Sequence, residues 1–335
     1  MNDDTYTAVQ YGLGPIGSRI ATTAHETGFE FVGAVDIDPE KVGRPVGDVA
    51  GFDTDADVTV TDDAADALVA DPDVVFHSTG SSVEAVAPQL REIASAGANV
   101  VSTTEELSYP WWNAPEVAAD LDAVAEENDV TVLGTGINPG FVMDTMPAVL
   151  STPMASVDAV TVERVQDAGE RREPLQKKVG AGVSVETFEE EIATEAGHVG
   201  STESVAMLAN ALGFDLDGIE ESIEPVVDEG GAESDFVTVE PGDVAGLRQV
   251  AHGSVDGETV VTLDLQMYVG ADDPHDRVGF EGDPPVSVTV EGGYHGDVAT
   301  SAVVTNVAPN VVAARPGLRS MLDVTTPSFT RQARR

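Results

Sequence analysis

Short apolar runs alternate with stretches of helical periodicity over the first part of the chain. Runs rich in valine and phenylalanine predict buried strands at residues 7–11, 29–35, 58–61, 74–77, 99–102 and 130–134. Amphipathic patterns between them predict helices at residues 18–27, 64–70, 83–96 and 115–127. Strands and helices that alternate in this way predict an α/β domain with a doubly wound parallel sheet.

The pattern changes after the turn signal Asn138-Pro139-Gly140. Beyond it we expect helices at residues 185–196 and 201–212 and strands at residues 157–165, 236–240, 258–269 and 286–292. The last apolar stretch, residues 307–323, is expected to form a helix interrupted at Pro316-Gly317. We therefore expect a first domain at 1–138, completed by 307–335, and a second, α+β domain at 139–306 that binds substrate and dimerises.

A glycine-rich segment follows the first expected strand and begins the first expected helix. Its glycines are Gly12, Gly14 and Gly17, with Pro15 and Ile16 among the residues between them. In this spacing the first glycine permits a tight turn, the second lets the backbone approach a pyrophosphate, and the third allows close packing of helix on strand. Backbone N–H groups at the start of the helix attract the phosphates. A strand before the motif and a helix after it favour a Rossmann domain over a simple glycine-rich turn.

Asp36 closes the second strand, at the distance of about 20 residues expected for the acid that binds the adenosine ribose. This position favours NAD, because the 2′-phosphate of NADP would face a carboxylate. Arg44 or Arg19 would soften that repulsion, so NADP stays open. Ligands bind at the carboxyl ends of parallel strands. We therefore expect the loops after the later strands to bind the cofactor through Ser78, Thr79, Gly80, Ser102 and Thr103.

Seven longer segments, spread over nearly the whole chain, carry a more specific signal. They are HSTGSS (77–82), NVVSTTEELSYP (99–110), GTGINPGFVMD (134–144), QKKVGAG (176–182), GHVGSTE (197–203), LQMYVG (265–270) and GYHGDVA (293–299). Together they resemble the 2,4-diaminopentanoate dehydrogenases and the related native amine dehydrogenases, a group similar to dihydrodipicolinate reductase. The chain lacks the paired histidines and the Pro-Ser-Gly-Thr segment of true dihydrodipicolinate reductases. It also has Thr104-Glu105 where homoserine dehydrogenases carry a catalytic lysine.

The resemblance implies an oxidoreductase that performs reversible oxidative deamination with NAD or NADP. Hydride leaves the amine-bearing carbon for the nicotinamide, and water converts the remaining iminium into a ketone and ammonia. One carboxylate can bind the ammonium, accept a proton and activate the water. Glu105, the first acid after strand 99–102, is expected to be this group, and Glu106 points elsewhere if the chain is extended there. Alternatively, both glutamates simply begin a helix, where acids complement the dipole.

Four further residues are expected to contribute to catalysis or to the substrate pocket, each with a structural alternative. Asn138 would bind the substrate amine or the nicotinamide amide, or else cap a helix before Pro139. His198 is the best histidine candidate for catalysis, or else a structural residue between two helices. Phe141 and Met143 would line the pocket, or else pack in the core.

A substrate carboxylate would require a cation, and residues 164–178 form the densest basic stretch of the chain. Arg164 and Arg171 are expected to bind this carboxylate, with Arg164 favoured because it ends an expected strand. The alternative is that these cations compensate neighbouring acids or touch the cofactor phosphates. None of the six histidines has metal-ligand spacing, so no metal is expected.

The net charge of −44, from 60 acidic and 16 basic residues, excludes nucleic acid and anionic membranes as partners. The apolar content of 41% is sufficient for a core, so the charge indicates an extreme halophile, in whose cytoplasm molar salt shortens the Debye length to about 3 Å. The absence of cysteine, of an apparent signal segment and of a membrane-length apolar run fits a cytoplasmic protein. A homodimer is expected by analogy. A dihydrodipicolinate-type imine reductase and a non-catalytic dinucleotide sensor remain as alternatives.

Overall fold

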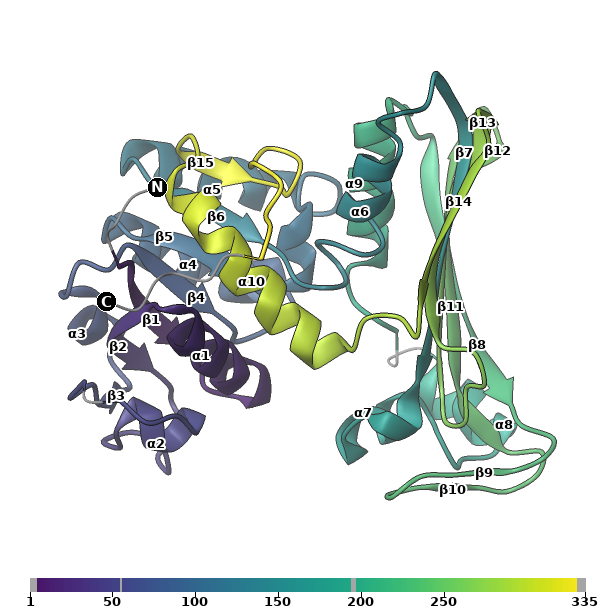
Figure 1. The fold of residues 1–335 in the computed structure, drawn as a ribbon, viewed down its shortest axis with the longest axis horizontal. Coiled ribbons are helices and arrows are strands. Elements are labelled where there is room, and N and C mark those ends of the chain that lie inside the picture. Colours follow the sequence, from purple (N-terminus) through teal and green to yellow (C-terminus); the bar gives the residue numbers. More distant parts are fainter. Residues whose placement is uncertain (1–4, 55, 194–196, 330–335) are drawn as a thin grey trace. The chain divides into compact units, whose positions relative to one another are not determined.

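The computed structural model describes residues 5–54, 56–193 and 197–329. The chain divides into two compact units (Figure 1). Unit 1 contains Met1–Phe141 and His295–Arg335, and unit 2 contains Val142–Tyr294. The segment that returns to unit 1 therefore begins at His295, whereas the sequence pattern placed this return at residue 307.

Unit 1 is a Rossmann domain built on a seven-stranded parallel sheet with the order β15-β6-β5-β4-β1-β2-β3. Its strands are β1 (Thr7–Tyr11), β2 (Glu30–Val35), β3 (Val60–Thr61), β4 (Val74–His77), β5 (Asn99–Ser102), β6 (Thr131–Gly134) and β15 (Gly317–Arg319). The strand order reverses between β1 and β4. In an open parallel sheet the loops at such a switch point form the ligand-binding crevice. The six strands predicted for the first domain are all present.

Helices cover both faces of this sheet (Figure 1). They are α1 (Pro15–Thr27), α2 (Val46–Ala50), α3 (Ala64–Leu68), α4 (Val83–Ser95), α5 (Pro115–Glu127) and α10 (Gly296–Val312), with a 3-10 turn η1 (Glu105–Ser108). Helices α1 and α10 pack against each other on one face, and α4 and α5 pack against each other on the opposite face. Valines of β1, β4, β5 and β6 form one core with the apolar sides of α4 and α5.

The expected C-terminal helix at residues 307–323 is wrong. Helix α10 begins earlier, at Gly296, and ends at Val312. The residues after Pro316 form β15, which pairs in parallel with β6 at the edge of the sheet. The helix is apolar nearly all round, so its start shows no amphipathic boundary. A three-residue edge strand is too short to give an alternating pattern.

Unit 2 contains a six-stranded mixed sheet with the order β14-β13-β7-β12-β11-β8. Its strands are β7 (Ser156–Asp167), β8 (Gly218–Val227), β11 (Val244–Val255), β12 (Glu258–Tyr268), β13 (His275–Asp283) and β14 (Val286–Glu291), and β9 (Ala232–Glu233) pairs separately with β10 (Thr238–Val239). Strands β7 and β12 run parallel and the other neighbours antiparallel. Unit 2 is the expected α+β domain.

The helical segments of unit 2 are α6 (Thr145–Leu150), η2 (Ala168–Glu170), α7 (Glu173–Lys178), α8 (Val185–Thr187), the π-helical turn η3 (Phe188–Ile192) and α9 (Ser201–Leu212). Helix α9 packs on β8, β11 and β12. Instead of one helix at residues 185–196, the structure has α8 followed by η3, and residues 194–196 lie outside the described part of the chain. Strands β8, β11 and β13 were not predicted, because charged and glycine residues interrupt their apolar alternation. The strand expected at 236–240 is only the two-residue β10.

Candidate functional site

The glycine-rich loop of unit 1 has the geometry that a pyrophosphate requires. Gly12 has φ +90°, and a Cβ there would lie 2.5 Å from the Ser78 carbonyl oxygen. Gly17 packs against the Gly12 backbone, whereas a Cβ added to Gly14 would meet no atom within 4 Å. Helix α1 starts at Pro15, and no side chain caps its first N–H groups. The described loop therefore offers open space and unsatisfied N–H donors at one helix start, which fits a dinucleotide phosphate.

Asp36 lies at the carboxyl end of β2, and three donors contact its carboxylate. Its carboxylate accepts hydrogen bonds from the Leu13 N–H at 2.7 Å and the Asp38 N–H at 2.9 Å, and Lys41 Nζ lies 3.1 Å away. Burial raises the pKa of Asp36, but these hydrogen bonds outweigh it and the net pKa is lowered. Asp36 is therefore a fixed anion beside the glycine loop. Arg44 lies in the same segment and is exposed.

The loop after β4 supports the glycine loop. The Ser78 hydroxyl donates to the Gly12 carbonyl at 3.0 Å and accepts from the Gln10 amide at 3.0 Å. Gln10 also donates to the Gly12 carbonyl at 2.8 Å. Ser78 thus has a structural role in shaping the loop, while Thr79 and Gly80 are exposed at its tip.

His77 links the ends of β4 and β5 from a fully buried position. Its Nδ1 lies 2.9 Å from Ser102 Oγ, and its Nε2 lies 2.9 Å from Gln89 Oε1 on α4. The Ser102 hydroxyl also lies 3.0 Å from Thr104 Oγ1, which donates to the Gly80 carbonyl at 2.8 Å. Burial lowers the pKa of His77 to about 4, so the ring is neutral at pH 7. Ser102, expected to bind cofactor, instead directs its side chain into this network, whereas Thr103 is half-buried.

The two adjacent glutamates after β5 have different surroundings. Both lie in η1, so the chain is not extended there and the condition under which Glu106 would point away from Glu105 is not met. Glu106 Oε2 accepts a hydrogen bond from the Val83 N–H at 2.8 Å and so caps the start of α4. Glu105 is half-buried in the same turn, directly after the strand end that His77 holds. Glu106 therefore has a structural task at the start of α4, whereas Glu105 lies directly after the strand end at the carboxyl edge of the sheet.

The segment after β6 turns sharply. The Asn138–Pro139 peptide bond is cis, and residues 138–144 form turns, so no helix starts at Pro139 for Asn138 to cap. Asn138 and Phe141 are half-buried in unit 1. Met143 belongs to unit 2 and is buried, which indicates core packing. Helix α6 begins instead at Thr145, after Asp144, whose carboxylate accepts from the Thr145 N–H and from the Ser204 hydroxyl at 2.7 Å.

Arg164 occupies the covered face of the unit 2 sheet and is 2% exposed. Its guanidinium pairs with Asp276 and donates to the Tyr294 carbonyl at 2.8 Å. The Asp276 carboxylate in turn accepts from the Tyr294 N–H at 2.8 Å. Burial lowers the pKa of Arg164, and Asp276 opposes this shift. The arginine favoured for binding a substrate carboxylate is therefore engaged in an internal ion pair.

His198 lies in a loop that Gln249 anchors through the His198 N–H at 2.6 Å and the His198 carbonyl at 3.0 Å. Its Nδ1 lies 2.8 Å from the Val199 carbonyl. Desolvation lowers the pKa of His198 to about 4, and positive charge on Lys178, Arg164 and Arg171 acts in the same direction. His198 is thus a neutral, half-buried imidazole in a cationic part of unit 2. Arg171 is also half-buried and belongs to this group.

Several residues that shape the candidate sites were not singled out from the sequence. They are Gln10, Lys41, His77, Gln89, Gln249 and Asp276. His77 and Gln10 interrupt otherwise apolar strands, and a polar residue in such a strand signals a buried hydrogen-bonded role. Asp276 and Gln249 lie on β13 and β11, which were themselves not predicted, so no signal pointed to them.

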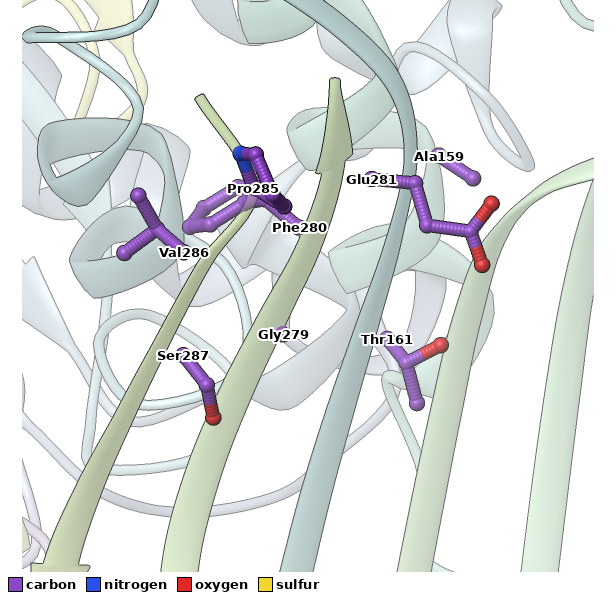
Figure 2. Close-up of a pocket in the computed structure, with 8 residues that line it drawn as sticks. All are labelled: Ala159, Thr161, Gly279, Phe280, Glu281, Pro285, Val286 and Ser287. Carbon is purple, nitrogen blue, oxygen red and sulfur yellow. The ribbon is translucent and has the colours of Figure 1, made fainter. Parts of the chain in front are cut away.

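A pocket of about 370 Å³ lies on the unit 2 sheet, over β7, β13 and β14 (Figure 2). Ala159, Thr161 and Ser287 contribute small side chains to it and Gly279 contributes backbone, and none of its lining residues is a predicted site residue. Over the described ranges, no helix is long and apolar enough to cross a membrane. The same residues contain no cluster of three or more histidines and acids placed to bind a metal.

Comparison with known proteins gives a consistent family. The model of the 2,4-diaminopentanoate dehydrogenase C-terminal domain matches residues 141–335. The chain is 31% identical to a 2,4-diaminopentanoate dehydrogenase of Acetoanaerobium sticklandii, over 94% of this chain and 92% of the relative. It is 26% identical to an amine dehydrogenase of Streptomyces virginiae, over 94% and 95% of the two chains.

Solved structures extend this result to the fold. An amine dehydrogenase from Mycobacterium smegmatis has a TM-score of 0.84 at 26% identity and covers 98% of this chain and 99% of its own. A dihydrodipicolinate reductase from Paenisporosarcina sp. TG-14 has a TM-score of 0.55 at 13% identity, with 95% and 98% covered, and is similar in fold alone. The match to the family model over more than half of the chain, and to the A. sticklandii protein over nearly all of it, shows that this chain belongs to the 2,4-diaminopentanoate dehydrogenase family.

Proposed function

We propose that the protein catalyses the NAD(P)-dependent, reversible oxidative deamination of an amine or a diamino acid resembling 2,4-diaminopentanoate. The relatives named as 2,4-diaminopentanoate and amine dehydrogenases support this activity. The observation that carries it in this chain is the position of Glu105. The glutamate follows β5 at the carboxyl edge of the Rossmann sheet, where ligands bind, while its neighbour Glu106 caps α4.

Glu105 supplies the proton chemistry in this proposal. When bound, the nicotinamide accepts the hydride that leaves the amine-bearing carbon. The Glu105 carboxylate binds the substrate ammonium and takes one proton, so that the neutral amine can lose hydride. It then releases this proton to solvent, and the regenerated carboxylate stabilises the cationic iminium of the substrate and deprotonates the attacking water. The balanced products are a ketone, ammonium, the reduced cofactor and one proton. Asn138 orients the substrate amine or the nicotinamide amide.

Unit 2 supplies recognition of a second substrate group. Arg171 and the neutral imidazole of His198 lie in a cationic group that suits a substrate carboxylate. A ring that stays neutral at pH 7 accepts or donates one hydrogen bond without adding charge. Arg171 replaces Arg164 as the carboxylate ligand in this proposal, because Arg164 already pairs with Asp276. Phe141 adds apolar contact for the carbon chain.

The cofactor is a nicotinamide dinucleotide, and we favour NAD over NADP because Asp36 is held as an anion beside the glycine loop. Gly12, Gly14, Pro15, Ile16 and Gly17 form the pyrophosphate cradle, and Thr79, Gly80 and Thr103 face the nicotinamide ribose in this proposal. Because these cofactors are intracellular metabolites, we place the enzyme in the cytoplasm.

The activity is tested by a screen of diamino acids and simple amines with each oxidised cofactor in molar potassium chloride. The reverse direction distinguishes the alternatives. We expect oxidation of the reduced cofactor by a ketone to require ammonium. Turnover of a cyclic imine without ammonium would instead identify a dihydrodipicolinate-type reductase. Tight cofactor binding without turnover of any amine or imine would identify a dinucleotide sensor.

We also propose that the protein works in molar salt, as in the cytoplasm of an extreme halophile. The net charge of −44 gives strong self-repulsion in dilute buffer, and a Debye length of about 3 Å at 1 M salt removes most of it. Thermal unfolding should therefore shift to lower temperature as salt is withdrawn without ligand. An unchanged midpoint in dilute buffer would show that the acidity serves another purpose.

A homodimer through the unit 2 sheet is our proposal for the assembly. Small side chains around the pocket of Figure 2 allow two sheets to approach to about 10 Å. A Cβ added to Gly279 would meet only the Thr161 carbonyl, at 4.0 Å, so the monomer can accept a larger residue there. Gly279→Trp should give a folded monomer in sedimentation velocity, whereas Val69→Trp, on a position 83% exposed in unit 1, should stay dimeric. A dimeric Gly279→Trp would rule out this face.

A further inference from the structure

Lys41 occupies an unusual electrostatic position in unit 1. The chain has only three lysines, and Lys41 is the one that belongs to this unit. Its Nζ lies 3.1 Å from Asp36 Oδ2 and 3.4 Å from Asp38 Oδ2, and its side chain is about a quarter exposed. The chain has 60 acids and 16 bases, so a lysine beside Asp36 is unusual. It reduces the negative charge at the proposed ribose site, where NAD and NADP differ.

Before a ligand binds, Lys41 occupies one of the hydrogen-bond acceptor positions of the Asp36 carboxylate. Oδ2 accepts from the Leu13 N–H and from Lys41 Nζ, and Oδ1 accepts from the Asp38 N–H. A carboxylate offers about four acceptor positions, so about one remains for a ribose hydroxyl. A site that takes only NAD is expected to present an uncompensated carboxylate to both ribose hydroxyls. Here the carboxylate already has its own counter-ion.

We propose that Lys41 is a specificity-determining residue that lets the site accept the 2′-phosphate of NADP as well as the ribose of NAD. With NAD bound, Lys41 stays on Asp36 and Asp38 and neutralises them. With NADP bound, the flexible stem lets Nζ leave the carboxylates and donate directly to the 2′-phosphate. The inference rests on the proposed function, since it takes the ligand of the glycine loop to be a nicotinamide dinucleotide.

Arg44 is the competing cation, because it lies three positions beyond Lys41 and was named from the sequence as a residue that would soften the repulsion of a 2′-phosphate. The structure places Arg44 in an exposed position, with its backbone carbonyl bound to the Val60 N–H. Lys41 is instead half-buried and aimed at the acid that contacts the ribose. The two cations therefore make different predictions, and matched substitutions separate them.

The test uses two adenosine fragments, so that it does not depend on turnover. Adenosine 2′,5′-bisphosphate carries the 2′-phosphate and adenosine 5′-monophosphate lacks it. Their dissociation constants are measured by calorimetry in molar potassium chloride for the wild type, Lys41→Met, Arg44→Met and Arg91→Met. Arg91 pairs with Asp120 on the surface of the same unit, so its substitution controls for the loss of one positive charge.

We expect Lys41→Met to weaken the bisphosphate by roughly tenfold or more and the monophosphate by less than about twofold, as for the loss of one charge-assisted hydrogen bond. Arg44→Met and Arg91→Met should change the ratio of the two constants little. The penalty of Lys41→Met should persist in an Asp36→Ser background, because a direct contact does not require the carboxylate.

Three results would overturn the inference. One is equal weakening of both fragments, which would make Lys41 a structural support for Asp36. Another is a penalty that disappears in the Asp36→Ser background, which would show simple neutralisation. The third is a change in the ratio of the two dissociation constants in Arg44→Met and no change in Lys41→Met. If neither fragment binds the wild type, the cofactor site itself fails, and the proposed function and this inference are rejected together.

Discussion

Two buried polar groups, one in each unit, hold neighbouring loops in place by different means. In unit 1 the neutral His77 joins Ser102 and Gln89, and burial keeps the pKa of His77 at about 4. In unit 2 Arg164 donates to the backbone carbonyl of Tyr294, and its ion-pair partner Asp276 accepts from the backbone N–H of the same residue. The neutral network puts little charge inside the protein, whereas the ion pair buries two opposite charges that must compensate each other.

This difference bears on the proposed catalytic groups. The His77 network under the end of β5 holds the loop before Glu105 with neutral groups, so this support adds no buried charge beside the proposed catalytic carboxylate. In unit 2 the buried Asp276 neutralises Arg164, and the carboxylate ligand that we propose is Arg171 instead. In this proposal the side chains that hold a loop and those that meet the substrate are different residues in both units.

The largest effect is expected for Glu105→Gln. This change keeps the size of the side chain but removes the charge and the base. General base catalysis supplies about 10²- to 10⁴-fold, so the rate of amine oxidation should fall by that factor. Cofactor affinity should change little, because the phosphates bind at Gly12–Gly17. Steady-state kinetics in high salt, with cofactor binding followed separately, measures both quantities.

Glu106→Gln is the matched control for that experiment. It keeps an acceptor for the Val83 N–H but removes the negative charge at the start of α4, so it should cost at most about 1 kcal/mol of stability and change turnover far less than Glu105→Gln. If Glu105→Gln keeps normal turnover and Glu106→Gln is inactive, Glu106 is the catalytic carboxylate and Glu105 is not. Normal turnover of both would exclude a carboxylate mechanism and shift the proton chemistry to His198.

The next effect concerns the ion pair of unit 2. Arg164→Met leaves the Asp276 carboxylate buried without its partner, which typically costs about 3–5 kcal/mol. We expect a large loss of stability in urea unfolding at high salt, partly recovered in Arg164→Met/Asp276→Asn.

By contrast, Arg171→Met should raise KM for a diamino acid but not for a simple amine. The comparison fails if Arg164→Met keeps its stability and shows this KM pattern instead.

The sequence predicted unit 1 far better than unit 2, for a physical reason. Parallel strands covered on both faces are continuous apolar runs, and their carboxyl ends meet at one edge, so Gly12, Asp36 and Glu105 could be placed before the fold was known. The sequence did not reveal that the Ser102 hydroxyl lies in the His77 network, because side-chain direction depends here on a residue distant in the sequence. In unit 2 the partner of Arg164 lies on β13, a strand whose charged and glycine residues hide its period. Ion pairs between such strands cannot be read from local pattern.

The neutral network of unit 1 predicts a pH effect of intermediate size. The pKa of His77 is about 4 in the folded state and 6.5 as its ordinary value, so the unfolded state binds more protons between these limits. Stability contributed by this group is present above pH 6.5 and is lost as the pH falls towards 4. Relative to His77→Gln, the wild type should lose about 2 kcal/mol between pH 7.5 and pH 5.

Denaturant unfolding of wild type and His77→Gln at a series of pH values, all in high salt, isolates this contribution, because the acids common to both proteins cancel. Between pH 7.5 and pH 8 the two curves should run parallel, since His77 is neutral in both states there. Parallel curves down to pH 5 would show that the buried ring titrates normally and that the contrast between the two polar groups does not hold.

The smallest effect is expected at Asp36, where the charge meets the cofactor. Asp36→Ser removes the carboxylate that would repel a 2′-phosphate and accept the ribose hydroxyls. The ratio of kcat/KM for NAD to that for NADP should therefore fall by roughly tenfold, the equivalent of about 1.4 kcal/mol. Asp38→Ser is the matched control, because Asp38 also pairs with Lys41 but is 41% exposed and serves Asp36 only through its N–H. Both variants release Lys41 from one carboxylate, so a fall in the ratio confined to Asp36→Ser would locate the adenosine ribose at Asp36. An equal fall in both would mean that freeing Lys41 is sufficient, and an unchanged ratio in both would mean that Asp36 only shapes the glycine loop through the Leu13 N–H.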